Sequence, residues 1–338
     1  MRTVFWSCIA VVACWSWMCA GPAVAQERVV IVGSGSNVPD RLYQAWVSQF
    51  NKKNSRIKVQ YLPLGTSESI KQISEGSGDF GGGEVPLTNE QIHNSKTPLI
   101  QIPMILVGIV PIYNLPGSPE LNFSGELLAQ IYLGTVKNWK DPRISKLNPG
   151  VEFPDLAVSV VHRSAGKGSN YIFTDFLSKT DAQFRGEIGK SPSPKWRHGT
   201  DANRGEDMVE RVATTRGAVG YVELNLARNA GVGYGRVQNA AGQFIRATPE
   251  SIAAACATAE NSTGNSLTNA PGRESYPMAS FTWIYVPRSG ASSERQRALK
   301  QFLMWGLQEG QDVAKSLGYA PLPNRIVSKA QAAADSLP

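Results

Sequence analysis

Short apolar runs, polar loops and amphipathic helical segments alternate along most of the chain. Val29–Val32 has the length and composition of a buried parallel strand. The apolar residues that follow Asp40 recur on one helical face and predict a helix: Leu42, Tyr43, Trp46, Val47 and Phe50. A second strand at residues 57–62 and a second helix from about Ser69 repeat this order. The repetition predicts an α/β domain with a mostly parallel sheet.

Two further apolar runs divide the chain into two parts. Gln101–Tyr113 predicts a strand that crosses into a second lobe, and Phe281–Val286 predicts a strand that returns. A second α/β set of helices and strands lies between them. We therefore expect lobe I to comprise residues 26–108 together with 283–338, and lobe II to comprise residues 109–282. The stretch 253–273, rich in Ala, Ser, Asn and Thr, predicts a surface excursion.

Residues 1–25 have the pattern of a secretory signal peptide. Arg2 precedes the apolar run Val4–Ala20, and Ala23-Val24-Ala25 supplies a small-x-small cleavage sequence. A membrane anchor is disfavoured because the apolar run is short and nothing similar follows it. We expect cleavage after Ala25 and export to a bacterial periplasm.

Composition narrows the class of ligand. Cys256 is the one cysteine outside the signal peptide, so no internal disulfide is expected, and we expect this thiol to be buried. The net charge of +7 favours anions weakly, but the basic residues are dispersed, which disfavours nucleic acid. With 3 histidines in the chain, we expect neither a transition metal nor a cofactor.

Three polar loops share one character. Each follows a short strand, contains Gly with Ser or Thr, and precedes a helix: Gly33–Val38, Gly65–Ser69 and Arg163–Asn170. Helix N-termini present free N–H groups and partial positive charge, so such loops can hold an anion. Any one loop is weak evidence, because the same residues make ordinary caps and turns. Two nucleotide motifs fail here, since Val38 occupies the third glycine position of a dinucleotide fingerprint and Gly168 follows Lys167 where a P-loop has Ser or Thr.

From about residue 29 to residue 325 the chain resembles the periplasmic phosphate-binding proteins of ABC importers. The resemblance rests on the order and spacing of GSGSNVPDRLYQAW, GTSESIKQI, GDFGGGEVPLT, IYLGTVKNWKDPRISKLNPG, HRSAGKGSNYIFTDFL, RGAVGYVE and SLGYAPLP. It implies a periplasmic binding protein fold: two α/β lobes with mixed, mostly parallel sheets, flanking helices and two crossover strands as a hinge. It also implies a monomeric, nonenzymatic binder that delivers phosphate or a related oxyanion to an ABC permease.

The resemblance also implies a set of ligand-binding positions, namely Asn37, Val38, Thr66, Glu84, Arg163, Lys167, Gly168 and Ser169. Thr66, Arg163 and Ser169 keep the hydroxyl donors and the bidentate guanidinium of the family. Glu84 keeps its acid but lengthens it by one methylene. A carboxylate that faces a bound anion requires a ligand that donates a proton, as hydrogen phosphate can and sulfate cannot.

Other positions depart from the family. Lys167 is a cation where the family has a neutral hydroxyl, and Ala165 replaces the aspartate that braces the arginine. If Lys167 pairs with Glu84, the site should tolerate fully ionised or esterified anions. If it does not, hydrogen phosphate stays preferred over sulfate, which is the outcome that we favour.

Two other functions stay open. The scaffold could bind a different solute, such as a phosphonate, a phosphate ester or a mainly neutral or lipid ligand. A secreted hydrolase ranks lower, because the chain has no Gly-x-Ser-x-Gly elbow, no His-rich metal set and no convincing Ser-His-Asp order.

Overall fold

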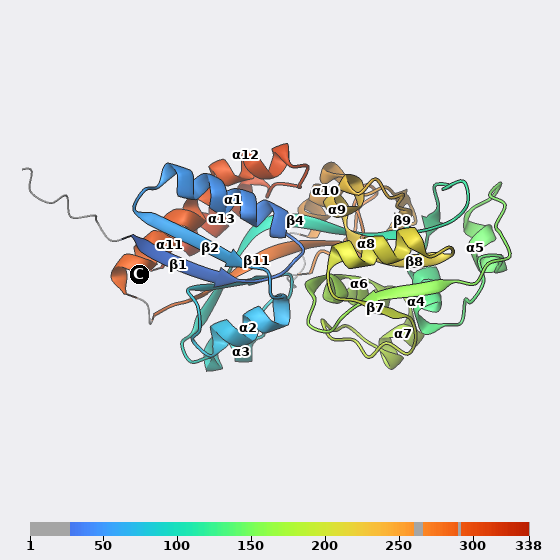
Figure 1. The fold of residues 1–338 in the computed structure, drawn as a ribbon, viewed down its shortest axis with the longest axis horizontal. Helices are drawn as coiled ribbons and strands as arrows, with labels where there is room; N and C mark the ends of the chain where they lie inside the picture. The colour runs from blue at the N-terminus through green and yellow to red at the C-terminus, as the bar shows by residue number, and fades with distance from the viewer. Residues whose placement is uncertain (1–27, 260–265, 290–291, 338) are drawn as a thin grey trace, which may run out of the picture.

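Strand β4 (Leu99–Tyr113) runs through both lobes of the computed structural model, which describes residues 28–259, 266–289 and 292–337 (Figure 1). Its residues Leu99–Gly108 pair antiparallel with β11 (Ala279–Pro287), and Ile109–Tyr113 pair antiparallel with β8 (Ala218–Glu223). β4 is buried without interruption from Met104 to Tyr113. This burial explains its continuous apolar sequence, because both faces of the strand are covered.

Lobe I lies at the left of Figure 1 and combines the N-terminal part of the chain with its C-terminal helices. Strand β1 (Val29–Ser34) pairs in parallel with β2 (Ile57–Leu62) and with β3 (Phe80–Gly83). The helices of this lobe are α1 (Asp40–Lys53), α2 (Thr66–Ser74), α3 (Asn89–Asn94), α11 (Ser293–Leu307), α12 (Glu309–Ser316) and α13 (Asn324–Asp335). The Trp46 indole on α1 donates to the carbonyl of Gly310 on α12 at 2.8 Å, which ties the two ends of the chain together.

Lobe II repeats the α/β arrangement at the right of Figure 1. Strand β6 (Ser159–Arg163) pairs in parallel with β8 and with β7 (Thr200–Ala202). A small sheet of β10 (Phe244–Ile245), β9 (Arg236–Gln238) and β5 (Asn122–Phe123) completes this lobe. Its helices are α4 (Gly125–Leu133), α5 (Pro142–Leu147), α6 (Gly168–Thr180), α7 (Ala182–Glu187), α8 (Gly205–Thr214), α9 (Leu224–Asn229) and α10 (Pro249–Ala259).

The predicted α/β fold with two lobes and mixed sheets is confirmed, with one difference in the sheets. The lobes share β4, so their strands form one 8-stranded order, β2-β1-β3-β11-β4-β8-β6-β7, in place of two separate sheets. Within the described residues, every antiparallel pair of this sheet involves β4 or β11, and the other pairs are parallel. The lobe boundaries at residues 108 and 283 stay predictions.

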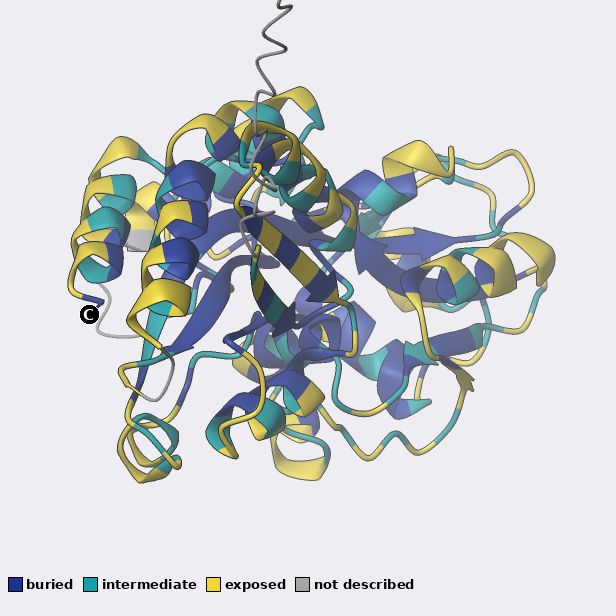
Figure 2. Cartoon of the chain, turned by 60° about the vertical axis from the view of Figure 1, so that its left-hand side comes forward, coloured by how far each residue is buried: buried dark blue, intermediate teal, exposed yellow. Residues whose placement is uncertain are grey.

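Buried residues concentrate on the strands and exposed residues on the helices that cover them. Figure 2 shows buried residues on the strands that join the lobes and exposed residues on the outer sides of the helices. β2, an edge strand, alternates buried and exposed residues. The predicted surface excursion at residues 253–273 was wrong, because α10 packs on the crossing strands and buries Ala255 and Cys256. Leu267, Thr268 and Ala270 are buried as well. Burial of the thiol is confirmed.

The signal peptide falls outside the described residues. Among those that are described, no helix combines the length and the apolar composition needed to cross a bilayer.

The glycines of β3 set how closely α2 approaches the sheet. A Cβ on Gly83 would lie 2.3 Å from Cγ2 and 2.9 Å from Oγ1 of Thr66, whereas a Cβ on Gly82 would meet nothing closer than 3.4 Å. We expect Gly83→Ala to displace Thr66 and to lower the free energy of unfolding by about 1–3 kcal/mol in urea titrations. Gly82→Ala is the matched control. Equal stability of the two variants would contradict this packing.

Candidate functional site

The polar loops that precede α1, α2 and α6 meet between the lobes. The Gly65 N–H donates to the Gly35 carbonyl at 2.8 Å, which joins the first two loops. The Ser67 N–H donates to the Gly166 carbonyl at 3.1 Å, which joins lobe I to lobe II. Gly65 and Gly166 have φ angles of +112° and +81°, a region that favours glycine. The convergence expected from the sequence is therefore present in the structure.

Glu84 lies at the centre of this junction, directly after β3. Its side chain is fully buried, and its Oε2 accepts a hydrogen bond from the Thr66 hydroxyl at 3.1 Å. Its Oε1 is buried without a partner. A Cβ on Gly168 would lie 1.6 Å from Oε2, so the carboxylate contacts lobe II at the first residue of α6, where only glycine fits.

Burial raises the pKa of Glu84 to about 7, although the hydroxyls of Ser36 and Thr66 and the charge of Arg163 partly oppose this shift. The carboxyl group therefore changes its protonation state close to neutral pH.

Arg163 is the buried cation of the site, with 4% of its surface exposed at the end of β6. Its Nε donates to the Ala202 carbonyl at 3.1 Å, its Nη2 to the Asn203 carbonyl at 2.9 Å and its Nη1 to the Ser169 hydroxyl at 3.4 Å. In the described ranges, no carboxylate forms an ion pair with this guanidinium. Burial lowers its pKa, and the charges of Tyr221, Glu206, Asp207 and Glu84 partly oppose this shift.

The two carbonyls that hold Arg163 replace the brace that the sequence lacks. Ala165 occupies the position of the family's aspartate, and β7 and the residue after it supply the carbonyls of Ala202 and Asn203 instead. Backbone acceptors fix the orientation of the guanidinium without neutralising its charge.

Lys167 does not pair with Glu84. It occupies the N-cap position of α6 and is partly exposed. Its Nζ lies 3.4 Å from where a Cβ on Gly65 would be, and no carboxylate of the described chain forms an ion pair with it. Burial and the charge of Arg163 lower the pKa of Lys167. The site thus contains the Arg163 cation and one buried acid whose pKa is raised to about 7.

The first loop contributes less than the resemblance implies. Asn37 donates from Nδ2 to the Pro63 carbonyl at 2.8 Å, and its Oδ1 is buried without a partner. The Val38 N–H donates to the Ser36 hydroxyl oxygen at 3.0 Å and is already satisfied. Ser36, which is 1% exposed, was missed by the sequence analysis. Its position between a Gly-rich turn and a helix could have identified Ser36 as a site residue from the sequence.

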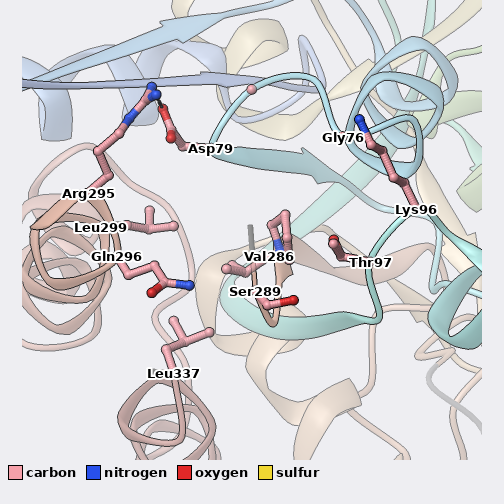
Figure 3. A pocket seen from close by; sticks show the side chains of 12 residues that line it. Gly76, Asp79, Lys96, Thr97, Val286, Ser289, Arg295, Gln296, Leu299 and Leu337 are labelled. Atoms are coloured by element: carbon pink, nitrogen blue, oxygen red, sulfur yellow. Dashed lines mark hydrogen bonds and ion pairs between the residues drawn. The ribbon is translucent and has the colours of Figure 1, made fainter. Parts of the chain in front are cut away.

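A cavity of about 140 Å³ adjoins these residues and is lined by Asn37, Val38 and Arg163 among others. Another cavity, of about 260 Å³, lies in lobe I between α11 and the start of β3 (Figure 3). None of the predicted site residues lines it. Its charged pair, Asp79 and Arg295, is joined at 2.7 Å, and Asp79 also accepts from the Val32 N–H at 2.8 Å. This pair connects α11 to β1 and serves the fold.

Comparison with known proteins agrees with this geometry. A family model described as "PBP superfamily domain" matches residues 21–309. The phosphate-binding protein PstS of Pasteurella multocida is 34% identical over 316 residues, which cover 92% of this chain and 91% of the relative. The chain belongs to the PstS family of phosphate-binding proteins. PstS of Haemophilus influenzae is 33% identical and covers 88% of this chain and 90% of the relative.

Solved structures share the fold of this chain. A high-affinity periplasmic phosphate-binding protein bound with phosphate superimposes with a TM-score of 0.71 at 17% identity, and covers 90% of this chain and 93% of its own. An ABC-type phosphate transport receptor from Vibrio cholerae gives 0.60 at 18% identity, with 87% and 100% covered. At these identities the likeness shows the fold alone. The PstS relatives are named as binding proteins, which confirms the prediction that the chain is not an enzyme.

The buried acid should make stability depend on pH. Because the pKa of Glu84 in the fold, about 7, exceeds its ordinary value of 4.5, the folded chain keeps a proton that the unfolded chain has released between these values. Stability should therefore fall as pH rises from 4.5 to 7. We expect Glu84→Gln to unfold with a free energy on the order of 1–3 kcal/mol higher than the native chain at pH 8.

The two proteins should differ little at pH 4, where the acid is protonated in both states. The exposed Glu75→Gln serves as the control. Urea titrations that give the same difference at both pH values would show that burial does not control this carboxyl.

Proposed function

We propose that the protein captures phosphate in the cleft between its lobes and delivers it to an ABC permease in the periplasm. The observation that carries this proposal is the buried Arg163 guanidinium, which has neutral oxygen partners and no carboxylate counterion. A buried charge of this kind is costly alone and favours an anion beside it. The PstS relatives are named for phosphate binding, which supports the choice of anion.

The donors around Arg163 suit a tetrahedral oxyanion. Ser169 contributes a hydroxyl in the first turn of α6, and the free N–H groups of this helix N-terminus add partial positive charge. Thr66 contributes a second hydroxyl from lobe I at the start of α2. Arg163 supplies charge-assisted hydrogen bonds from lobe II. Ligand binding would therefore hold both lobes to one anion.

Glu84 distinguishes a protonated oxyanion from a fully ionised one. Its unpartnered Oε1 can accept a hydrogen bond from hydrogen phosphate, while a sulfate oxygen would meet it only in repulsion. Because the pKa of Glu84 is raised to about 7, this discrimination operates above neutral pH. Below it, the protonated carboxyl can donate to either anion.

Lys167 adds positive charge to the site without forming an ion pair with Glu84. The absence of a Lys167–Glu84 pair supports the outcome in which hydrogen phosphate is preferred over sulfate. The lysine lies at the loop that touches Gly65 of the other lobe, so its charge acts on the anion from the rim of the cleft.

The remaining predictions form part of the same proposal. Residues 1–25 act as a signal peptide that is cleaved after Ala25, and the mature chain acts as a monomer. The lobes, residues 26–108 with 283–338 and residues 109–282, close on the ligand about β4 and β11. The change of pairing partner along β4 at Gly108 and Ile109 supports this hinge. A mainly neutral or lipid ligand is disfavoured by the uncompensated charge of Arg163.

Removal of the guanidinium should abolish most of the affinity. We expect Arg163→Ala to weaken phosphate binding by about 3–5 kcal/mol in calorimetric titrations, because it removes a desolvated charge-assisted partner. Arg216→Ala, an exposed arginine of the same lobe, should bind as the native chain does. Unchanged affinity in Arg163→Ala would place the ligand elsewhere.

Selectivity should depend on pH through Glu84. At pH 8 the native protein should prefer phosphate to sulfate by about 100-fold or more, and the preference should shrink at pH 5.5 as the carboxyl gains its proton. Glu84→Gln should show the weaker preference at both pH values. Competition titrations measure it, and equal affinity for both anions at pH 8 would refute the assigned role of Glu84.

A further inference from the structure

The two carbonyls that orient Arg163 belong to a short strand at the edge of the sheet. Strand β7 comprises only Thr200–Ala202 and ends the 8-stranded order, so β6 is its one strand neighbour within the described residues. Ala202 and the following Asn203 accept from Nε and Nη2 of Arg163. Short edge strands open easily, because one side of their backbone has no strand partner. The orientation of the guanidinium therefore depends on what holds β7 in place.

Ser164, the residue after Arg163, connects β7 to the rest of the site through its backbone. Its N–H donates to the Ala202 carbonyl at 3.1 Å, and its own carbonyl accepts from Nδ2 of Asn170 at 2.8 Å. Asn170 lies in the first turn of α6, next to Ser169. Strands β6 and β7 and the N-terminus of α6 are thus joined at Ser164.

Asp201 adds a side-chain link at the same place. In the parallel register of β6 and β7 it lies opposite His162, one residue before Ala202. Its Oδ2 accepts a hydrogen bond from the Ser164 hydroxyl at 2.5 Å. Its Oδ1 lies 3.5 Å from Nδ1 of His162, and burial lowers the pKa of this imidazole, which is therefore neutral at neutral pH. In the part of the chain that the structure describes, the Ser164 hydroxyl is thus the donor that engages Asp201.

The charge of Asp201 by itself disfavours an anion in this site. Burial and the charge of Arg163 lower the pKa of Lys167, and the charge of Asp201 opposes this shift, so it acts on the rim of the cleft. A carboxylate at that range repels an oxyanion, although its exposure to water weakens the repulsion. The hydrogen bond that Asp201 accepts from Ser164 is therefore the contribution that can favour binding.

We propose that Asp201 is a positioning residue for the bound oxyanion. By fixing Ser164 against β7, it holds in place the strand whose carbonyls orient Arg163 toward the cleft. It thereby compensates for the carboxylate that Ala165 lacks, although it acts through the backbone and not through an ion pair with the guanidinium. This inference rests on the proposed function, because the oxyanion must bind at Arg163.

Phosphate affinity of the mature chain, measured by calorimetry at pH 8, separates the hydrogen bond from the charge. Asp201→Ala removes both, and we expect it to weaken phosphate binding at least about tenfold because β7 and Arg163 lose their support. Asp201→Asn keeps an oxygen that accepts from the Ser164 hydroxyl and removes the charge, so it should bind phosphate at least as tightly as the native chain. Thr200→Ala, an exposed position of the same strand, is the matched control and should bind as the native chain does.

Combined variants test the route through Ser164 and Arg163. Ser164→Ala should weaken binding as Asp201→Ala does, and the two changes together should cost no more than about twofold beyond either one. Arg163→Lys keeps a charge but cannot bond both carbonyls, since lysine has a single ammonium group. In that background Asp201→Ala should change the affinity by less than about twofold. A full additional loss there would show that Asp201 does not act through the guanidinium.

The chain without ligand gives an independent measurement. The Nε–H of Arg163 donates to a carbonyl in a buried position, so its NMR signal, assigned by its absence in Arg163→Lys, should exchange slowly with solvent. The exchange should accelerate at least about tenfold in Asp201→Ala and stay slow in Asp201→Asn and Thr200→Ala.

The outcomes separate this inference from the function on which it rests. Native affinity in Asp201→Ala, or equal weakening in Asp201→Ala and Asp201→Asn, would overturn the inference and leave phosphate capture intact. If the native chain binds no phosphate, the proposed function fails, and solvent exchange decides whether Asp201 positions Arg163. Faster exchange in Asp201→Ala alone would support that role, and unchanged exchange would refute it.

Discussion

The charge of Arg163 is the constraint on which the rest of the site depends. A guanidinium that is 4% exposed must be oriented and solvated by the protein, and here backbone carbonyls of Ala202 and Asn203 do both. Neutral carbonyls orient the guanidinium but do not cancel its charge, as a carboxylate would. Its positive charge therefore remains available to an anion in the cleft. The loops before α2 and α6 then add hydroxyl groups and N–H groups around the same point.

Glu84 places a buried acid beside the buried cation Arg163. An acid that is fully buried near this cation could have formed an ion pair, yet it contacts the hydroxyls of Thr66 and Ser36 and the first residue of α6, Gly168. The acid thus keeps an acceptor free and stays close to its protonation midpoint at neutral pH. A site with a buried cation and a carboxyl that can be neutral suits an anion of variable charge.

The sequence predicted the elements that repeat local rules. The order of strands, loops and helices and the crossing strand at Gln101–Tyr113 follow from periodicity and loop composition, whereas Thr66, Arg163 and Ser169 were implied by the family resemblance. The carbonyls that hold Arg163 could not be predicted, because they belong to another strand and a carbonyl carries no residue signature. The buried side of α10 was missed for a related reason. Its Ala-rich sequence has little hydrophobic contrast, and only its packing on β4 and β11 makes Ala255 an interior residue.

The shared strand β4 has a mechanical consequence. A strand that is hydrogen-bonded along its length resists a sharp bend, because bending would break ladder bonds in a dry interior. A Cβ on Gly108 would lie 2.6 Å from Cδ1 of Ile252. The Ile252 side chain therefore packs closely against β4 at the point where its pairing changes from β11 to β8. A sharp bend at Gly108 and Ile109 would therefore have to break ladder hydrogen bonds or displace Ile252. The two lobes are thus connected through a buried, hydrogen-bonded strand of the shared sheet.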